Sequence, residues 1–208
     1  GMPGVIGNGA VFSGAGTSIR IAEHPAFDFS QGMSFSFWIK VANSQPDAVL
    51  FTRTGAGGQI TLQIRETGVN LRVVQAEAIF ETTGATQLPM EGWHHLAVTI
   101  ASQGPAIIYL DGVETERLDG PFDPGTITGD IFVGADAQGT GSFTGEMDEF
   151  RVSAGIRSPD WIKASHASQG ANGNFTAVMT EETGEATSGM PVFYLATIFA
   201  HITLDGMV

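Results

Sequence analysis

Residues 142–169 read SFTGEMDEFRVSAGIRSPDWIKASHASQ, and this stretch decides the fold that we expect for the 208-residue chain. Side chains alternate between the two faces of a β-strand. A strand over residues 143–152 would therefore place Met147 on one face and Phe150 and Val152 on the other. Apolar side chains on both faces are typical of a strand that is covered on both sides. The stretch thus predicts a buried strand, followed by a tight corner.

After this corner the sequence predicts a short helix over residues 159–168. Ser158 is a good N-cap residue, and Pro159 stands where a first helical residue tolerates the loss of its N–H. The apolar side of the helix would consist of Trp161, Ile162 and Ala164. Gly170 follows the helix and suits a left-handed C-terminal cap.

Four phrases, in order along the chain, carry a resemblance to a known family. They are GNGAVFSGAGTSIRIAEHPAFDF (7–29), SFSFWIKV (34–41), GWHHLAVTI with IIYLDGVE (92–114), and FTGEMDEFRVS with IRSPDWIKASHASQ (143–169). Over roughly residues 7–169 the chain resembles the laminin-G-like, concanavalin A-type jelly rolls of bacterial surface and envelope proteins. The resemblance implies an all-β fold, an antiparallel two-sheet sandwich with one short helix. It implies no single activity, because this architecture hosts lectins, glucanases and adhesion modules alike.

Alternation of apolar and polar residues elsewhere in the chain agrees with this fold. In residues 33–41 the side chains of every second residue, from Phe35 to Val41, are apolar. Residues 59–74 show the same alternation twice around a turn at 66–68, which predicts a hairpin with one buried and one solvated face. Asp111-Gly112 predicts a two-residue hairpin turn, since both residue types accept positive φ. About a dozen such short strands separated by turns predict a β-sandwich.

The charge and cysteine content of the chain limit the kinds of partner that we expect it to bind. The chain has 22 Asp and Glu against 9 Lys and Arg, a formal net charge of −13. Such an acidic surface repels phosphate backbones and anionic lipids, so we expect neither nucleic-acid binding nor membrane insertion. There is no cysteine, which excludes a disulfide scaffold. The resemblance implies an extracellular or cell-envelope location, and we expect any export signal to lie outside this sequence, since no charged-then-apolar leader begins it.

Two regions are expected along the chain. Residues 1–170 would form the jelly-roll domain, whereas residues 171–208 do not match the family. This tail begins as a polar, linker-like segment and ends in GMPVFYLATIFAHITL (189–204), which contains no charged residue. At about 16 residues that segment is shorter than the ~20 that a membrane helix needs, and its composition favours β-strand. We expect it to extend the sandwich or to pair with a second copy in a homo-oligomer.

Three carboxylates on the closing strand raise the question of catalysis. Glucanases of this fold use carboxylates spaced Glu-x-Asp-x-Glu or Glu-x-Asp-x-x-Glu, so that acid and nucleophile share one face. Here Glu146 and Asp148 have that spacing, but Phe150 and Arg151 stand where the last carboxylate would be, and Glu149 points the other way. We therefore expect no catalytic residues and no enzyme activity. A hydrolase using a different carboxylate pair stays open as an alternative.

Metal binding has weak support. The resemblance implies a structural calcium ion in many relatives, with an Asp after the first strand, but this chain has Ser13 there. Loop carboxylates could build another calcium site from Asp119, Asp123, Asp130 and Asp136, although loop Asp is more often a turn former. Calcium is thus a candidate cofactor without an assigned site.

The solvated face of the 59–74 hairpin is the candidate ligand site. Amide and guanidinium groups on a rigid sheet suit sugar hydroxyls or carboxylates. The residues predicted to bind the ligand are Gln63, Arg65, Asn70, Arg72 and His95, the last on a strand expected to lie beside the hairpin. The alternative is an ordinary solvated face. Trp38, Trp93 and Trp161 could also stack on sugar rings, but the family places comparable residues in packing positions.

These observations lead to a functional hypothesis. We expect a non-catalytic recognition module of an envelope or secreted protein, which binds a glycan or another protein. The alternatives are the glycoside hydrolase above and a structural or self-association module that pairs through residues 189–208.

Overall fold

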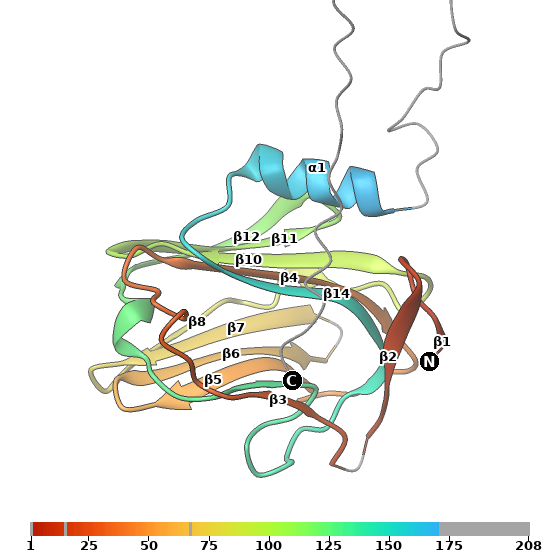
Figure 1. Ribbon diagram of the computed structural model, residues 1–208, viewed down its shortest axis with the longest axis horizontal. Coiled ribbons are helices and arrows are strands. Elements are labelled where there is room, and N and C mark those ends of the chain that lie inside the picture. Colours follow the sequence, from red (N-terminus) through yellow and green to blue (C-terminus); the bar gives the residue numbers. More distant parts are fainter. Residues whose placement is uncertain (1, 15, 67, 171–208) are drawn as a thin grey trace, which may run out of the picture. The chain divides into compact units, whose positions relative to one another are not determined.

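The computed structural model describes residues 2–14, 16–66 and 68–170, which form two β-sheets packed face to face (Figure 1). Every strand pair is antiparallel. This confirms the predicted all-β sandwich. The tail at residues 171–208 and the predictions made for it lie outside the described residues.

The first sheet contains the closing strand. In spatial order it consists of β1 (Met2–Pro3), β2 (Asn8–Ser13), β14 (Thr144–Ala154), β4 (Met33–Val41), β10 (His94–Ile100), β11 (Gly104–Leu110) and β12 (Val113–Phe122). The order is not that of the sequence, because the last strand is inserted between β2 and β4. The two ends of the domain therefore meet in the middle of one sheet, where β14 pairs with both neighbours.

The second sheet contains the predicted hairpin. In spatial order it consists of β3 (Ile19–Ile21), β13 (Ile131–Val133), β5 (Val49–Gly55), β6 (Gly58–Arg65), β7 (Gly68–Gln75) and β8 (Ala78–Glu81), and the short β9 (Thr86–Gln87) also pairs with β7. A 3₁₀ turn, η1 (Pro124–Thr126), precedes β13. Neither β9 nor η1 is expected from the sequence, because each is only two or three residues long.

The core lies between the two sheets. From β4 it takes Phe35, Phe37 and Ile39, and from β6 Ile60, Leu62 and Ile64, all buried as the alternation predicts. The rings of Phe35 and Phe51 stack across the gap with centroids 4.0 Å apart, which joins the first sheet to the second. Burial of this apolar surface is the main stabilising contribution in such a fold.

The closing strand does not keep a single alternation. Met147 faces the core opposite Ile39, and Val152 also faces the core, opposite Phe35. Both can do so because a β-bulge between Asp148 and Arg151, with Glu149 at φ 51°, changes the phase of the strand. The expectation that apolar side chains leave this strand on both faces is therefore wrong.

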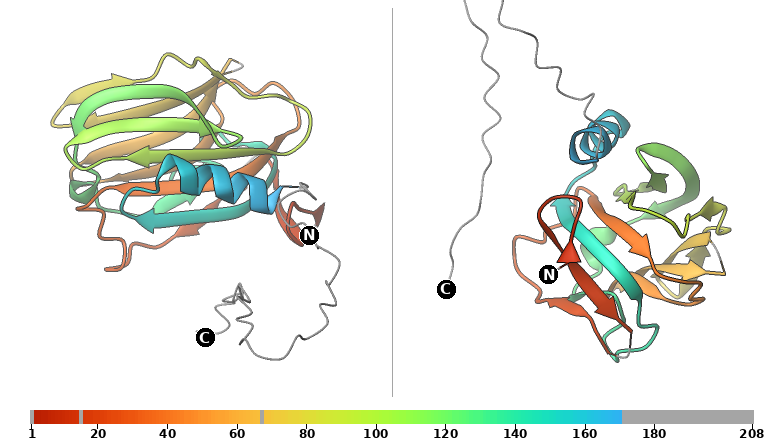
Figure 2. Two further views of the ribbon diagram at one scale, coloured as in Figure 1. Left: turned by 90° about the horizontal axis from the view of Figure 1, so that it is seen from above. Right: turned by 90° about the vertical axis from the view of Figure 1, so that its right-hand side faces the viewer.

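Helix α1 (Pro159–Gln169) covers the outer face of the first sheet (Figures 1 and 2). Ser158 caps it as predicted, since its Oγ accepts from the Trp161 N–H at 3.2 Å. Ile162 is buried against Ala97 and Tyr109, which explains why β10 and β11 also carry apolar side chains on their outer face. Ala164, expected on the apolar side, is exposed, and Ser165 is buried instead.

The end of the helix differs from expectation. Gly170 has φ −66° and ψ 166°, so it is extended and not left-handed. Its backbone N–H still closes the last turn by donating to the His166 carbonyl. A Cβ at this position would lie 3.1 Å from the His166 carbonyl oxygen and 3.2 Å from the Trp38 ring, so a side chain here would be tightly confined.

Candidate functional site

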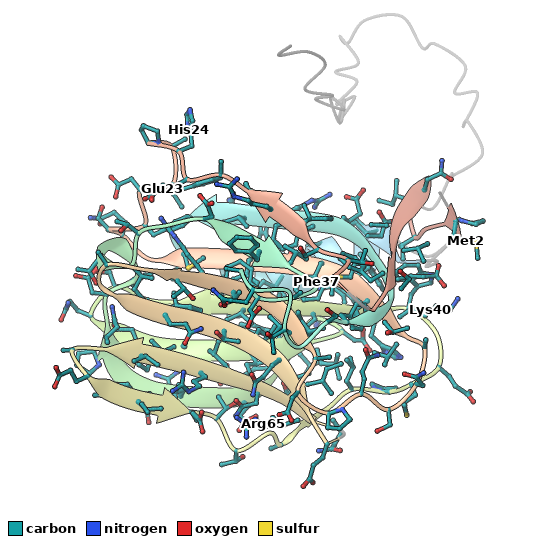
Figure 3. The ribbon with its side chains drawn as sticks, turned by 90° about the horizontal axis from the view of Figure 1, so that it is seen from below. Met2, Glu23, His24, Phe37, Lys40 and Arg65 are labelled. Carbon is teal, nitrogen blue, oxygen red and sulfur yellow. The ribbon has the colours of Figure 1, made fainter. Side chains whose placement is uncertain are left out.

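The outer face of the second sheet is mostly polar, with Phe132 as an exception, and is not covered by the helix (Figure 3). One cross-strand row runs over five strands. It contains Phe132, Thr52, Thr61, Arg72 and Glu81. Within it the Thr52 and Thr61 hydroxyls lie 3.0 Å apart, and Arg72 Nε pairs with a Glu81 carboxylate oxygen at 3.0 Å. A regular array of polar side chains on a rigid sheet is a surface that can recognise a ligand by hydrogen bonds.

Four of the five residues predicted to bind the ligand share this face. Gln63 pairs directly with Asn70 across β6 and β7, and Arg65 and Arg72 lie on either side of them. When the Gln63 amide is oriented with its oxygen toward Arg65, the Gln63 Oε1 accepts from Arg65 Nη2 at 3.0 Å. The structure therefore brings together Gln63, Arg65, Asn70 and Arg72 on one surface.

His95 does not belong to this surface. It lies on β10 in the first sheet, opposite Trp38 of β4, and is only 1 % exposed. Helix α1 covers it, with the His166 ring 6.1 Å away, so the expectation that its strand lies beside the hairpin is wrong. Alternation assigns a side chain to a face of its strand, but it does not say which sheet contains the strand.

A hollow of about 350 Å³ opens at one end of the polar face. It is lined by Arg65, Glu66, Gly68, Asn70, Glu81, Thr82, Thr83, Gly84 and Gln87, which we call the β7–β9 hollow. Gly68, Asn70 and Thr82 are buried and form its floor, whereas most of the other residues are exposed and form its rim. No apolar side chain is among these lining residues.

Asn70 is the unusual residue of this hollow. Its side chain is 6 % exposed, and its Nδ2 donates to the Thr82 carbonyl at 2.6 Å. Its Oδ1 has no hydrogen-bond partner. A buried acceptor without a partner costs roughly 1–3 kcal/mol. This oxygen has almost no accessible surface of its own, so a ligand group would have to enter the floor of the hollow to donate to it and recover part of that cost.

Residues from the first sheet hold the wall of the hollow. The Glu116 carboxylate, on edge strand β12, accepts from the Thr83 N–H at 2.5 Å, the Thr83 hydroxyl at 2.7 Å and the Ala85 N–H at 3.0 Å. At Gly68 a Cβ would lie 2.1 Å from the Gly84 carbonyl, so only glycine allows the wall to approach β7. Neither role is visible in the sequence, since both depend on contacts between segments distant along the chain.

The carboxylates of the closing strand are engaged in the fold. Glu146 pairs with Lys40 at 3.0 Å, and Glu149 pairs with Arg151. Asp148 accepts from the backbone N–H groups of Ile6 and Glu149, at 3.0 and 2.8 Å. These bonds hold the N-terminal segment and the bulge of the closing strand in place.

The four loop aspartates each serve a separate turn or ion pair. Asp123 caps η1, Asp136 accepts from two N–H groups of its own loop, and Asp119 pairs with Arg117. Asp130 accepts from the Glu23 backbone N–H and from the Arg20 guanidinium, and these bonds, the first above all, hold the pKa of its carboxyl below the ordinary value. Across residues 2–14, 16–66 and 68–170, no group of three or more His, Cys, Asp or Glu side chains is arranged to hold a metal ion.

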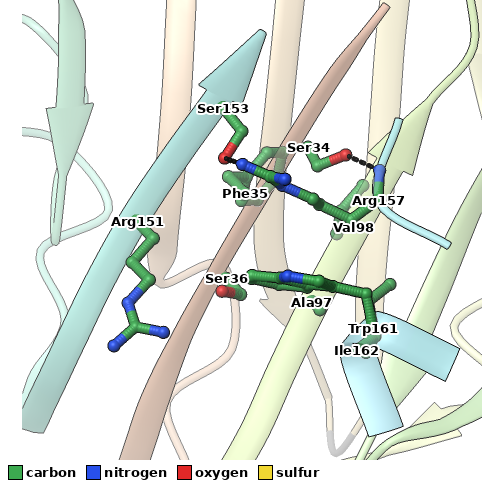
Figure 4. A pocket seen from close by; sticks show the side chains of 10 residues that line it. All are labelled: Ser34, Phe35, Ser36, Ala97, Val98, Arg151, Ser153, Arg157, Trp161 and Ile162. Carbon is green, nitrogen blue, oxygen red and sulfur yellow. Dashed lines mark hydrogen bonds between the residues drawn. The ribbon is translucent and has the colours of Figure 1, made fainter. Parts of the chain in front are cut away.

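The interface between helix α1 and its sheet is a packing region. It contains a cavity of only about 10 Å³, beside which the Arg157 guanidinium stacks on the Trp161 ring at 4.8 Å (Figure 4). The Arg157 N–H donates to Ser34 Oγ at 2.9 Å, and its guanidinium donates to Ser153 Oγ. These contacts fix the corner before the helix. Trp161 is thus used for packing.

A second, aromatic hollow lies at the other end of helix α1. It encloses about 530 Å³ and is lined by Gly4, Val5, Trp38, Trp93, His166, Gln169 and Gly170. Trp38 is only 3 % exposed, its Nε1 donates to Gln169 Oε1 at 2.9 Å, and its ring stacks on His166. Of the two tryptophans that line this hollow, Trp38 is buried and Trp93 is partly exposed. We call this the Trp93 hollow.

Comparison with known families gives one match. A family model described as the concanavalin A-like lectin/glucanases superfamily matches residues 13–163. No curated protein matches the chain. None of the helices among the described residues has the length and apolar character that a membrane crossing requires.

Solved structures share the architecture at low sequence identity. Domain 4 of AbnA, an extracellular arabinanase from Geobacillus stearothermophilus solved in complex with arabinotriose, is 23 % identical with a TM-score of 0.64 over 77 % of each chain. A pentraxin from Limulus polyphemus is 13 % identical with a TM-score of 0.57, over 78 % of this chain and 82 % of its own. The binding domain of botulinum neurotoxin DC, in complex with SialylT, is 10 % identical with a TM-score of 0.62, and the match covers 79 % of this chain but 45 % of that one. At these identities the likeness shows the fold alone.

Proposed function

Because the chain belongs to the concanavalin A-like lectin/glucanase superfamily, we propose that it is a non-catalytic carbohydrate-recognition module and that the β7–β9 hollow is its binding site. The fold presents a rigid polar sheet face, and rigid elements lower the cost of ordering a site when a ligand binds. Two structural neighbours were solved with carbohydrate ligands, an arabinotriose and a sialyl sugar, which supports this class of ligand.

The unpartnered Asn70 oxygen in an entirely polar hollow carries the proposal. Sugars present many hydroxyl donors and acceptors, and the hollow offers carboxylate, amide, hydroxyl and guanidinium groups within one volume. At about 350 Å³ its size is at the lower end for ligand pockets, which suits one end or a short segment of an oligosaccharide. The Trp93 hollow carries less weight, since one of its two tryptophans is buried by helix α1.

The non-catalytic part of the proposal is supported by the closing strand. Glycoside hydrolysis by the common mechanisms needs two carboxyl groups that face each other across the scissile bond. Glu146, Asp148 and Glu149 instead bond to Lys40, to backbone N–H groups and to Arg151. An extracellular or envelope location accords with the extracellular arabinanase among the neighbours. Binding of a protein partner, or self-association through residues 189–208, stays an alternative role.

Replacement of Asn70 by alanine tests the proposed site. The variant removes the floor acceptor and the Nδ2 bond to the Thr82 carbonyl, so we expect affinity for a bound glycan to fall about tenfold or more, the equivalent of at least about 1.4 kcal/mol. Binding partners would first be identified on a glycan array that includes arabinotriose, and affinity would then be measured by calorimetry.

The matched control is Asn8→Ala, which removes an exposed amide from strand β2 of the other sheet. It should bind like the wild type, and thermal unfolding of both variants would show whether each is folded. Equal affinity of folded Asn70→Ala and wild-type protein would place the glycan site elsewhere. Absence of binding to every glycan on the array, with a protein partner found instead, would remove the carbohydrate role.

A further inference from the structure

The β7–β9 hollow combines acceptor groups with an excess of negative charge. Glu66 and Glu81 stand on its rim, and the floor oxygen of Asn70 has no donor. From these features we infer that the hollow selects neutral, hydroxyl-rich sugars and rejects sugars that carry a carboxylate. This inference rests on the proposed function and specifies its ligand class.

The cations near the hollow are already paired. Arg72 bonds to Glu81 at 3.0 Å and to Gln59 Oε1 at 3.1 Å. Arg65 lies 3.7 Å from the Asp47 carboxylate and also donates to Gln63. An anionic ligand that recruited either guanidinium would have to displace a carboxylate or compete with it. Arg72 is therefore not a ready binding group for an acidic sugar, and at Arg65, whose exposed pair with Asp47 is weak, such a sugar would still meet the Asp47 carboxylate as a competitor.

The net charge around the hollow also disfavours sugars that carry a carboxylate. Four carboxylates, of Asp47, Glu66, Glu81 and Glu116, stand at or beside the hollow against the guanidinium groups of Arg65 and Arg72, which leaves two net negative charges. The whole chain, these groups included, carries a formal net charge of −13. A sugar carboxylate placed beside Glu81 would meet like charge at short range, and such juxtapositions are strongly unfavourable.

Hydrogen-bond chemistry agrees with the charge. The Asn70 Nδ2 is occupied by the Thr82 carbonyl, so the group that remains is the Oδ1 acceptor, which needs a donor. The rim carboxylates of Glu66 and Glu81 also only accept when ionised. Neutral sugars supply hydroxyl donors at most of their ring carbons, whereas a carboxylate that occupies the place of such a hydroxyl supplies none. A site built to bond a hydroxyl discriminates strongly against an analogue that lacks it.

A paired set of glycans tests this selectivity on the full chain. Each pair would share one neutral oligosaccharide core, without and with a terminal sialic or uronic acid, and calorimetry would give both affinities at low and at physiological salt. We expect the neutral member to bind about tenfold more tightly or better. The penalty for the acidic member should shrink as salt screens the repulsion.

Two variants test whether the charge of the rim carboxylates, and not the shape of the hollow, causes the selectivity. Glu66→Gln removes a rim charge that makes no ion pair among the described residues, and Glu81→Gln removes the charge that pairs with Arg72. Both should raise affinity for the acidic member several-fold and by more than they change affinity for the neutral member, so that the ratio of neutral to acidic affinity falls. Glu114→Gln, an exposed position on β12 away from the hollow, should change neither.

The outcomes distinguish this inference from the proposed function. Equal or tighter binding of the acidic members would overturn the selectivity and leave carbohydrate recognition standing. Rim variants that leave both affinities unchanged would likewise overturn it. Failure of every member of every pair to bind would overturn the proposed function itself, and the selectivity with it.

Discussion

Replacement of Phe51 by alanine is expected to lower the free energy of unfolding by about 3–5 kcal/mol, the range for large aromatic residues in well-packed cores. Phe51 is fully buried, and its ring stacks on Phe35 of the opposite sheet with centroids 4.0 Å apart. The centroid of its ring also lies 6.4 Å from that of Phe150 on the closing strand. The loss should be large because one side chain joins β5 to both β4 and β14.

Chemical denaturation would measure this loss, and Phe132→Ala offers a matched control. Phe132 lies on the neighbouring strand β13, opposite Thr52 on the outer face, and is partly exposed. Its replacement should cost about 1 kcal/mol or less, because less apolar surface returns to water. Equal costs for the two substitutions would contradict a core located between the two sheets.

Acidification is expected to destabilise the protein through His95. Burial lowers the pKa of this imidazole to about 4, with a further contribution from the neighbouring His166. Arg151 acts in the same direction, whereas Asp111 opposes the shift. Its Nδ1 has no hydrogen-bond partner, so the folded state holds the ring neutral without compensation for charge.

The direction of the effect follows from proton binding. In the unfolded chain the imidazole has its ordinary pKa, near 6.5, so between pH 6.5 and about 4 the unfolded state binds a proton that the folded state does not. The His95 contribution is therefore neutral above pH 6.5 and increasingly unfavourable as pH falls, and the loss is complete below about pH 4. Between pH 6.5 and about 4, the free energy of unfolding therefore falls by about 3 kcal/mol because of His95.

Unfolding measured at pH 7 and at pH 4 in wild type and His95→Phe would test this expectation. The variant keeps a ring and loses the titrating nitrogen, so wild type should lose about 3 kcal/mol more than the variant between the two pH values. His24→Gln, at an exposed imidazole, should behave as wild type. If the free energy of unfolding depended on pH in the same way in wild type and His95→Phe, the pKa of His95 would be the same in the folded and unfolded states, which contradicts this expectation.

Local sequence patterns are sufficient for much of the fold. The capped helix after Ser158, the Asp111-Gly112 turn and the hairpin at 59–74 all depend on residues close in sequence, and each is present in the structure. Burial of alternating residues in β4 and β6 follows in the same way, because one face of each strand meets the core.

The rest depends on contacts that no local pattern encodes. The bulge at Glu149 changes the phase of the closing strand, so alternation assigns Phe150 and Val152 to the wrong face. The position of His95 depends on strand order, and the wall of the hollow depends on Glu116, a residue of the other sheet. Four of the five predicted ligand residues still lie together, because β6 and β7 form one hairpin whose register is fixed by a short turn.

Chemical-shift mapping with a bound glycan tests the central claim most directly. Backbone amide spectra of the full chain would be recorded during titration with the strongest neutral glycan from the array. Our account predicts that the shifts concentrate at residues 65–70 and 81–87, around the β7–β9 hollow. Shifts concentrated instead around Trp93, His166 and Gln169 would contradict it and assign recognition to the Trp93 hollow on the opposite sheet.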